Sequence, residues 1–221
     1  MVTLDPELQA LKGNLLDMVE LTKKQLKKCV SAVEEGDIKL AKDVLEKEKR
    51  INDLELNIDK DCENILALHS PVASDLRFVL AALKISGNLE RIGDNSKSIA
   101  KFITKSIKNS DLAILKKFDF VKMVNLAISM LEDMEDAIRN NNVKPAKKVA
   151  DRDDELDENT KHALKVAAKL IREKPENSDL VLKTYTVIRR LERIGDYIKN
   201  IGEEVVFHLE GKVIKHQAER Q

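Results

Sequence analysis

A six-residue string occurs twice in this chain, and it limits the folds that the chain can adopt. Leu-Glu-Arg-Ile-Gly-Asp runs over residues 89–94 and again over residues 191–196, an offset of 102 in a chain of 221. An offset close to half the length indicates a tandem duplication. We therefore expect two similar units, residues 1–108 and residues 109–221, each long enough to bury a hydrophobic core.

The spacing of the apolar residues favours long helices in both units. Leu8, Leu11 and Leu15 recur at intervals of three and four residues, which is helical periodicity. Only seven Gly and four Pro interrupt the chain, and a charged fraction of 35% is typical of long amphipathic helices. We predict an all-α protein of two tandem three-helix bundles, which together form an elongated six-helix molecule.

Breaks in the apolar pattern divide each unit into three expected helices. Gly36-Asp37 ends the first helix of the first unit and begins the second, and residues 140–142, three asparagines, stand at the same place in the second unit. Ser70 is expected to cap the third helix, with Pro71 as its first residue. The six expected helices span about residues 8–33, 40–69, 71–103, 112–139, 143–173 and 175–209.

Composition excludes several classes of protein. Lys plus Arg and Asp plus Glu both total 39, and aromatic residues make up 3%, which argues against a nucleic-acid binder. The longest apolar runs, such as residues 78–83, are too short to cross a membrane, and no signal peptide is visible. Cys29 and Cys62 fall among apolar positions and are interpreted as buried thiols. We expect a cytoplasmic protein that does not insert into membranes.

Acidic residues recur on the third expected helix of each unit. Glu90 and Asp94 are four residues apart, as are Glu192 and Asp196, so each pair shares one helix face that points away from the core. The glycine of each string lies in mid-helix, where it costs about 0.5–1 kcal/mol relative to alanine. A duplicated acidic pair beside a duplicated glycine suggests a site rather than ordinary solvated surface.

The second expected helix of each unit carries a matching pattern. Glu48 precedes Asn52 by four residues, and Asp153 precedes Asp157 by four, with an aliphatic residue before each second member. Because the second and third helices are antiparallel neighbours, these pairs can lie beside the acidic pairs. Carboxylates gathered in this way repel one another unless a cation intervenes. Oxygen donors suit Mg²⁺, Ca²⁺, Mn²⁺ or iron, and the absence of a Glu-x-x-His string argues against a di-iron oxidase.

At these residues the sequence resembles the PhoU family of bacterial phosphate-uptake regulators. The doubled Glu-Arg-Ile-Gly-Asp is the specific part of the match, which runs nearly end to end and includes residues 48–59, residues 71–77 and the tail 210–216. The resemblance implies two three-helix bundles and metal ions, sometimes multinuclear iron or zinc clusters. It assigns one site to the first half and one to the second, and the implied ligands are Glu48, Asn52, Glu90 and Asp94, then Asp153, Asp157, Glu192, Asp196 and Asn200. Ser98 stands where the first half would carry the counterpart of Asn200.

The resemblance also implies partners and a role. Family members link the phosphate-specific ABC transporter, through its ATPase subunit, to a sensor histidine kinase, and they hold the phosphate-starvation response off when phosphate is plentiful. They act by protein contact at the inner membrane face, commonly as homodimers. The expected function is therefore a metal-binding negative regulator of phosphate uptake and signalling, and not an enzyme.

Two alternatives remain open from the residues themselves. A carboxylate-metal phosphohydrolase would use two metal ions to activate water, but the sequence has no evident Lys/Arg/Gly-rich phosphate cradle. A ligand-free helical spacer would explain the helices and the charge. It would leave Gly93 and Gly195 unexplained, since a mid-helix glycine admits close approach of another group.

Overall fold

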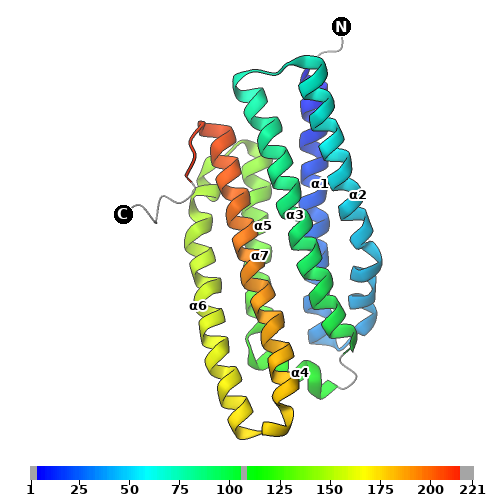
Figure 1. The fold of residues 1–221 in the computed structure, drawn as a ribbon, viewed down its shortest axis with the longest axis vertical. Helices are drawn as coiled ribbons and strands as arrows, with labels where there is room; N and C mark the ends of the chain where they lie inside the picture. The colour runs from blue at the N-terminus through cyan, green and yellow to red at the C-terminus, as the bar shows by residue number, and fades with distance from the viewer. Residues whose placement is uncertain (1–3, 106–108, 215–221) are drawn as a thin grey trace.

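The chain folds into long helices that follow one common axis, apart from a short one at the end of the molecule (Figure 1). The computed structural model describes residues 4–105 and 109–214, and these contain no strand. The elements in order are α1 (Leu4–Glu35), α2 (Ile38–His69), α3 (Ala73–Lys105), α4 (Asn109–Lys117), α5 (Phe120–Asn140), α6 (Val143–Glu173), the 3-10 turn η1 (Pro175–Asn177) and α7 (Ser178–Glu210).

The long helices form two three-helix bundles that lie side by side. Helices α1, α2 and α3 make the first bundle and α5, α6 and α7 the second, and the bundles meet where α3 packs on α7 and α1 on α5 (Figure 1). The predicted all-α class and the two tandem bundles are confirmed. The predicted division between residues 108 and 109 stays a prediction, because residue 108 lies outside the described residues.

The two bundles are related by an approximate two-fold axis. Helices α3 and α7 are corresponding helices of the two repeats, and they run antiparallel. Lys84 on α3 donates to Glu204 on α7 at 3.2 Å, whereas Asn95, further along α3, meets Arg190, nearer the start of α7, at 3.4 Å. The doubled string lies between these two contacts on both helices, so the axis passes close to it.

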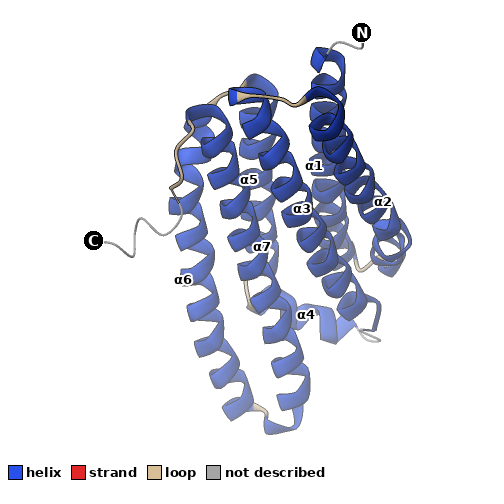
Figure 2. Cartoon of the chain, turned by 45° about the horizontal axis from the view of Figure 1, so that its top comes forward, coloured by secondary structure: helices blue, strands red, loops and turns tan. Residues whose placement is uncertain are grey.

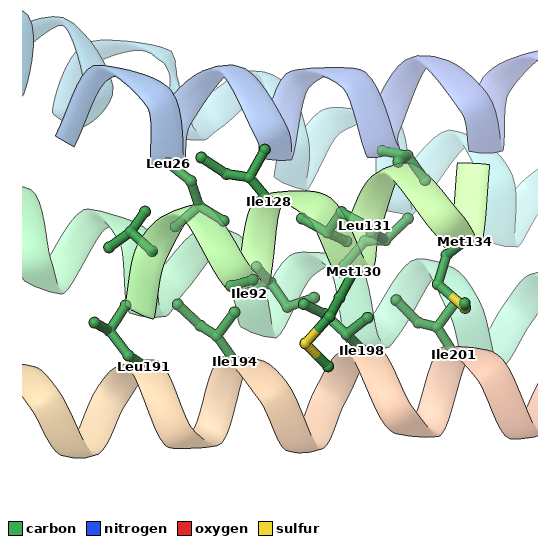
Figure 3. Close-up of a cluster of buried hydrophobic side chains, with 14 of the residues drawn as sticks. Leu26, Ile92, Ile128, Met130, Leu131, Met134, Leu191, Ile194, Ile198 and Ile201 are labelled. Carbon is green, nitrogen blue, oxygen red and sulfur yellow. The ribbon is translucent and has the colours of Figure 1, made fainter. Parts of the chain in front are cut away.

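One hydrophobic core runs through both bundles and across the seam between them. Leu26 on α1, Ile92 on α3, Leu131 on α5 and Ile194 on α7 are all fully buried, and Figure 3 shows side chains of this set facing one another. Burying an aliphatic side chain of this size contributes about 1.5–3 kcal/mol. The fold therefore depends on the apolar stripes of helices from both repeats.

The expected helix over residues 112–139 is interrupted, which corrects the sequence prediction. Asp119 adopts a left-handed conformation with φ of 54° between α4 and α5, and α4 lies across the end of the bundles (Figure 2). Phe118 and Phe120, on either side of Asp119, are 2% and 0% exposed. A change of direction at Asp119 lets both rings enter the core, which a continuous helix does not allow.

The turn before α3 also differs from the prediction. Ser70 ends α2 in a left-handed conformation with φ of 46°, and α3 begins at Ala73, so neither the predicted Ser70 cap nor the predicted Pro71 start is correct. Pro71 is buried, whereas Val72 is exposed. The proline ring packs inward as part of the connection, and the helix starts only after it.

The first turn of each repeat is as predicted. Gly36 has a φ of 72°, and the Asp37 carboxylate accepts a hydrogen bond from the backbone N–H two residues on at 2.9 Å. In the second repeat Asn141 has a φ of 51°, and the Asn142 side chain accepts the equivalent bond at 3.1 Å. Asparagine tolerates the left-handed conformation, so it replaces glycine at this position.

Two smaller predictions concern the thiols and the membrane. Cys29 and Cys62 are buried free cysteines, as expected, and burial raises the pKa of each thiol to about 12. Inert, neutral thiols of this kind pack as small hydrophobic groups. No helix within the described residues combines the length and the apolar character needed to cross a membrane.

Candidate functional site

The predicted ligands of the first half come together on neighbouring faces of α2 and α3. Glu48 is only 7% exposed, and its carboxylate accepts a hydrogen bond from Asn52 at 3.0 Å. The Lys97 ammonium lies 2.8 Å from the same carboxylate. Glu90 is half-buried and Asp94 is exposed at the edge of this group. We call these residues the first carboxylate group.

Electrostatic effects differ between members of the first carboxylate group. Burial raises the pKa of Glu48, but the hydrogen bonds from Lys97 and Asn52 outweigh it, so the pKa lies below its usual value. Burial, and then the charges of Asp94 and Glu55, raise the pKa of Glu90. The counter-charge of Lys97 therefore serves mainly Glu48, while at Glu90 burial and the neighbouring carboxylates outweigh the opposing charge of Arg91.

The second carboxylate group lies on α6 and α7, and it is centred on Asp153. This residue is 1% exposed, with Oδ2 3.1 Å from the Lys199 ammonium and with Oδ1 buried and without a hydrogen-bond partner in the structure. Burial raises the pKa of Asp153, and Asp196 and Asp157 add to this effect, so the opposing charge of Lys199 does not restore its usual value. Burial and the charges of Glu192 and Asp157 raise the pKa of Asp196 in the same way.

Sequence reasoning missed a duplicated lysine in these groups. Lys97 and Lys199 stand 102 residues apart, each three residues after the aspartate of the doubled string. Each forms an ion pair with the corresponding acid of the preceding helix, Glu48 or Asp153. The sequence contained the signal, because the offset is the same as that of the string. A lysine is therefore the counter-ion of the most buried carboxylate in each half.

The mid-helix glycines make room for side chains of α2 and α6. A Cβ added to Gly93 would lie 3.1 Å from Cδ1 of Ile51. A Cβ added to Gly195 would lie 2.6 Å from Cδ1 of Leu156 and 2.7 Å from Oδ1 of Asp153. The group that closely approaches each glycine, as expected from the sequence, is thus the aliphatic side chain on the preceding long helix, Ile51 or Leu156. At Gly195 the buried Oδ1 atom of Asp153 also approaches the glycine closely.

The nine predicted ligands are gathered by half but do not form ready-made metal sites. Asp94, Glu90, Glu48 and Asn52 share one region, and the second-half acids share another, with Asn200 partly buried one turn beyond Asp196. Over residues 4–105 and 109–214, no three His, Cys, Asp or Glu side chains are arranged to hold a metal ion. Binding would require movement of carboxylates or lysines.

The donor chemistry of the second carboxylate group suits a hard cation. All its charged donors are oxygens, and the Oδ1 atom of Asp153 is buried without a partner beside Gly195. Raised pKa values at Asp153 and Asp196 indicate that the ionised carboxylates lack sufficient positive charge nearby. Oxygen-only donors of this kind fit Mg²⁺, Mn²⁺, Ca²⁺ or iron better than thiol-preferring ions.

Asp153→Asn and Glu48→Gln are expected to change the pH dependence of stability in opposite directions. The folded-state pKa of Asp153 is raised, so the folded chain binds more protons and its stability falls as pH rises above about 4. The folded-state pKa of Glu48 is lowered, so its contribution is present above about pH 4.3 and is lost on acidification.

Urea unfolding of chelator-treated protein between about pH 2.5 and pH 7 measures both effects, the Glu48 effect below about pH 4.3 and the Asp153 effect above about pH 4. Wild-type stability minus that of Asp153→Asn should fall as pH rises, and wild-type stability minus that of Glu48→Gln should rise. Equal slopes for the two corresponding acids would contradict the electrostatic description of the two groups.

Known proteins match both halves of the chain. A family model described as "PhoU domain" matches residues 15–103 and residues 120–205. The "Phosphate-specific transport system accessory protein PhoU homolog" of Pseudomonas putida is 34% identical over 211 residues, which cover 95% of this chain and 82% of that protein. The "Phosphate-specific transport system accessory protein PhoU" of Escherichia coli K12 is 28% identical over 210 residues, which cover 95% and 86%.

Solved structures match over nearly the whole chain. The crystal structure of PhoU from Pseudomonas aeruginosa has a TM-score of 0.84 at 31% identity, and the match covers 95% of this chain and 100% of that one. The phosphate transport system regulatory protein PhoU from Streptococcus pneumoniae has a TM-score of 0.83 at 28% identity, covering 96% and 100%. The arrangement of two three-helix bundles is therefore common to this chain and to both solved proteins.

Proposed function

The chain belongs to the PhoU family, and from this premise we propose that it is a metal-binding accessory protein, without catalytic activity, that regulates phosphate uptake and phosphate-starvation signalling. The observation that carries the proposal is the match of both halves to the family, together with a carboxylate group in each half. Relatives that span most of this chain are named accessory proteins of the phosphate-specific transport system.

The proposed partners are the ATPase subunit of a phosphate ABC transporter and a sensor histidine kinase. The chain would act as a homodimer by protein contact at the cytoplasmic face of the membrane. The names of the relatives refer to the transport system, which supports the first partner. The kinase and the homodimer rest on the family resemblance.

The proposed metal sites use the two carboxylate groups. In the first half the ligands are Glu48, Asn52, Glu90 and Asp94, and in the second they are Asp153, Asp157, Glu192 and Asp196, with Asn200. Iron or zinc is proposed from the family, and Mg²⁺, Mn²⁺ or Ca²⁺ would suit the same oxygen donors. A bound cation would supply the positive charge that Lys97 and Lys199 provide to one acid each.

Deleting the gene in the organism that encodes this chain tests the regulatory role. A phosphate-starvation reporter is expected to stay active in the deletion strain when phosphate is plentiful, and the wild-type gene should restore repression. The variant with Glu90, Asp94, Glu192 and Asp196 all replaced by alanine should be produced at a normal level yet fail to restore it. An unchanged reporter in the deletion strain would refute the proposal.

A metal-dependent phosphohydrolase is the rival function, because paired metal ions can activate water for phosphoryl transfer. The exposed position of Asp94 and Asp196 on helix faces favours a regulator, since hydrolases enclose the reacting group. Purified protein supplemented with each candidate metal should give no turnover of phosphate esters above a metal-only control. Turnover that disappears in Asp153→Asn would establish the enzyme instead.

A further inference from the structure

The two arginines of the doubled string line one open hollow at the seam between the bundles. Arg91 and Arg193 both line a cavity of about 370 Å³ between α3 and α7. They converge because α3 and α7 are corresponding helices that run antiparallel, so equivalent residues near the pseudo-two-fold axis lie close together. The guanidinium carbon of Arg91 lies 5.8 Å from the centre of the Tyr197 ring on the opposite helix.

Positive charge dominates the lining of this cavity, which we call the seam cavity. Its charged side chains are Arg91, Lys97, Lys101, Arg190, Arg193 and Asp94. Lys97 is paired with Glu48, and Arg91 is attracted by the carboxylates of Glu55 and Glu90. In the part of the chain that the structure describes, the four cations other than Lys97 form no direct ion pair with a carboxylate. Like charges this close repel, and a bound anion would remove the repulsion.

The basic surface continues along the seam beyond this cavity. A second hollow of about 460 Å³ shares Lys101 and Arg190 with the first, and it adds Lys105 and Lys183. Of the two added lysines, Lys183 is paired with Asp179. The continuation supplies a positive potential that attracts anions toward the seam.

Arginine side chains favour phosphate oxyanions in particular. A guanidinium group presents parallel N–H donors that match two oxygens of one phosphate. The hydroxyl groups of Ser98 and Tyr197 also line the cavity, and they can donate further hydrogen bonds.

Asp94 gives the seam cavity a means of discrimination. An ionised carboxylate only accepts hydrogen bonds, so it repels an anion that has no proton to offer. Inorganic phosphate near neutral pH always carries at least one O–H group, whereas sulfate carries none. A single carboxylate among four unpaired cations therefore favours phosphate over sulfate.

We propose that the seam cavity between α3 and α7 binds inorganic phosphate, with Arg91, Arg193, Arg190 and Lys101 as donors to its oxygens and Asp94 as the acceptor of its proton. The site joins the two repeats, and it depends on the duplication, because each repeat supplies one copy of the motif arginine. This inference does not depend on metal binding, and it can be tested on metal-free protein.

Isothermal titration calorimetry of the full-length chain, after treatment with chelator and at low ionic strength, tests the proposal. Wild-type protein should bind phosphate, and binding should weaken when salt is added. Arg91→Gln with Arg193→Gln should weaken phosphate binding at least about tenfold, as should Lys101→Gln with Arg190→Gln. Lys169→Gln with Arg172→Gln removes the same charge from the end of α6 and should leave binding unchanged.

The comparison of phosphate with sulfate tests the assigned role of Asp94. Wild-type protein should bind phosphate more tightly than sulfate, and Asp94→Asn should bring the two affinities together. The inference is overturned if wild-type protein binds no phosphate, if the arginine pair has no effect, or if wild-type protein binds sulfate as tightly as phosphate. Failure of the metal proposal would leave these outcomes unchanged.

Discussion

Replacing the four acids of the doubled string by alanine is expected to abolish tight metal binding while leaving the helices folded. The four changes are Glu90→Ala, Asp94→Ala, Glu192→Ala and Asp196→Ala. Their side chains are half-buried or exposed, so no cavity forms in the core. The pKa values of Glu90 and Asp196 are raised, first by burial and then by neighbouring carboxylates, so the metal-free variant should be at least as stable as wild type at pH 7.

Thermal and urea unfolding with and without metal measure this effect. A ligand at about one hundred times its dissociation constant stabilises the folded state by about 2.7 kcal/mol for each site, and we expect this gain at each of the two proposed sites in wild type and none in the variant. A control with the same loss of charge replaces four exposed acids outside the two groups, Glu34, Glu46, Glu158 and Glu176. Retained stoichiometric metal in the first variant, or loss of metal in the control, would contradict the site assignment.

Ile194→Ala is expected to destabilise the whole molecule by about 2–5 kcal/mol. Ile194 is fully buried at the seam, where Figure 3 shows it near side chains of α5. Truncation removes apolar contacts and leaves a cavity bordered by helices of both bundles. These helices cannot all shift inward to fill it. Because the core runs through both bundles, the loss should appear as one lowered transition rather than as unfolding of the second bundle alone.

Chemical denaturation followed by circular dichroism measures this loss, and Leu182→Ala on the same helix provides the control. Leu182 is 55% exposed, so its truncation should change stability by no more than about 0.5 kcal/mol. Ile92→Ala, at the equivalent position of the first repeat, should resemble Ile194→Ala. A loss below about 1 kcal/mol for both isoleucines would contradict the shared core.

The doubled string separates what the sequence predicted from what it could not predict. Periodicity predicted the helices that carry it, and the four-residue spacing placed its two acids on one helix face. Both conclusions need only the geometry of one helix. The reason for the two glycines could not be predicted from one helix. Only the packing of α2 and α6 shows that Ile51 and Leu156 occupy the space beside Gly93 and Gly195.

The role proposed for the arginine of the string could not be predicted from one repeat alone. Arg91 and Arg193 line the same cavity because the repeats pack antiparallel across α3 and α7, and nothing within one repeat specifies how two repeats dock. The break at Asp119 was missed for a similar reason. Burial of Phe118 and Phe120 is decided by tertiary contacts and not by the local pattern.

The counter-ions Lys97 and Lys199 could not be predicted from the clustering of acids alone. Clustered acids suggested a cation, and the structure places the ammonium groups of Lys97 and Lys199 beside Glu48 and Asp153. These lysines neutralise one acid in each half and leave the raised pKa values of Glu90 and Asp196. A metal ion would therefore compete with a lysine for the most buried acid, and replacing Lys199 by methionine removes that competition.

The metal content of full-length protein purified without chelator tests the central claim most directly. Inductively coupled plasma mass spectrometry should find a bound metal in wild type, about half as much in Glu192→Ala with Asp196→Ala, and none when all four acids of the doubled string are replaced. Wild-type protein that carries no metal, and takes up none on dialysis against iron, zinc, manganese or magnesium, would contradict the account.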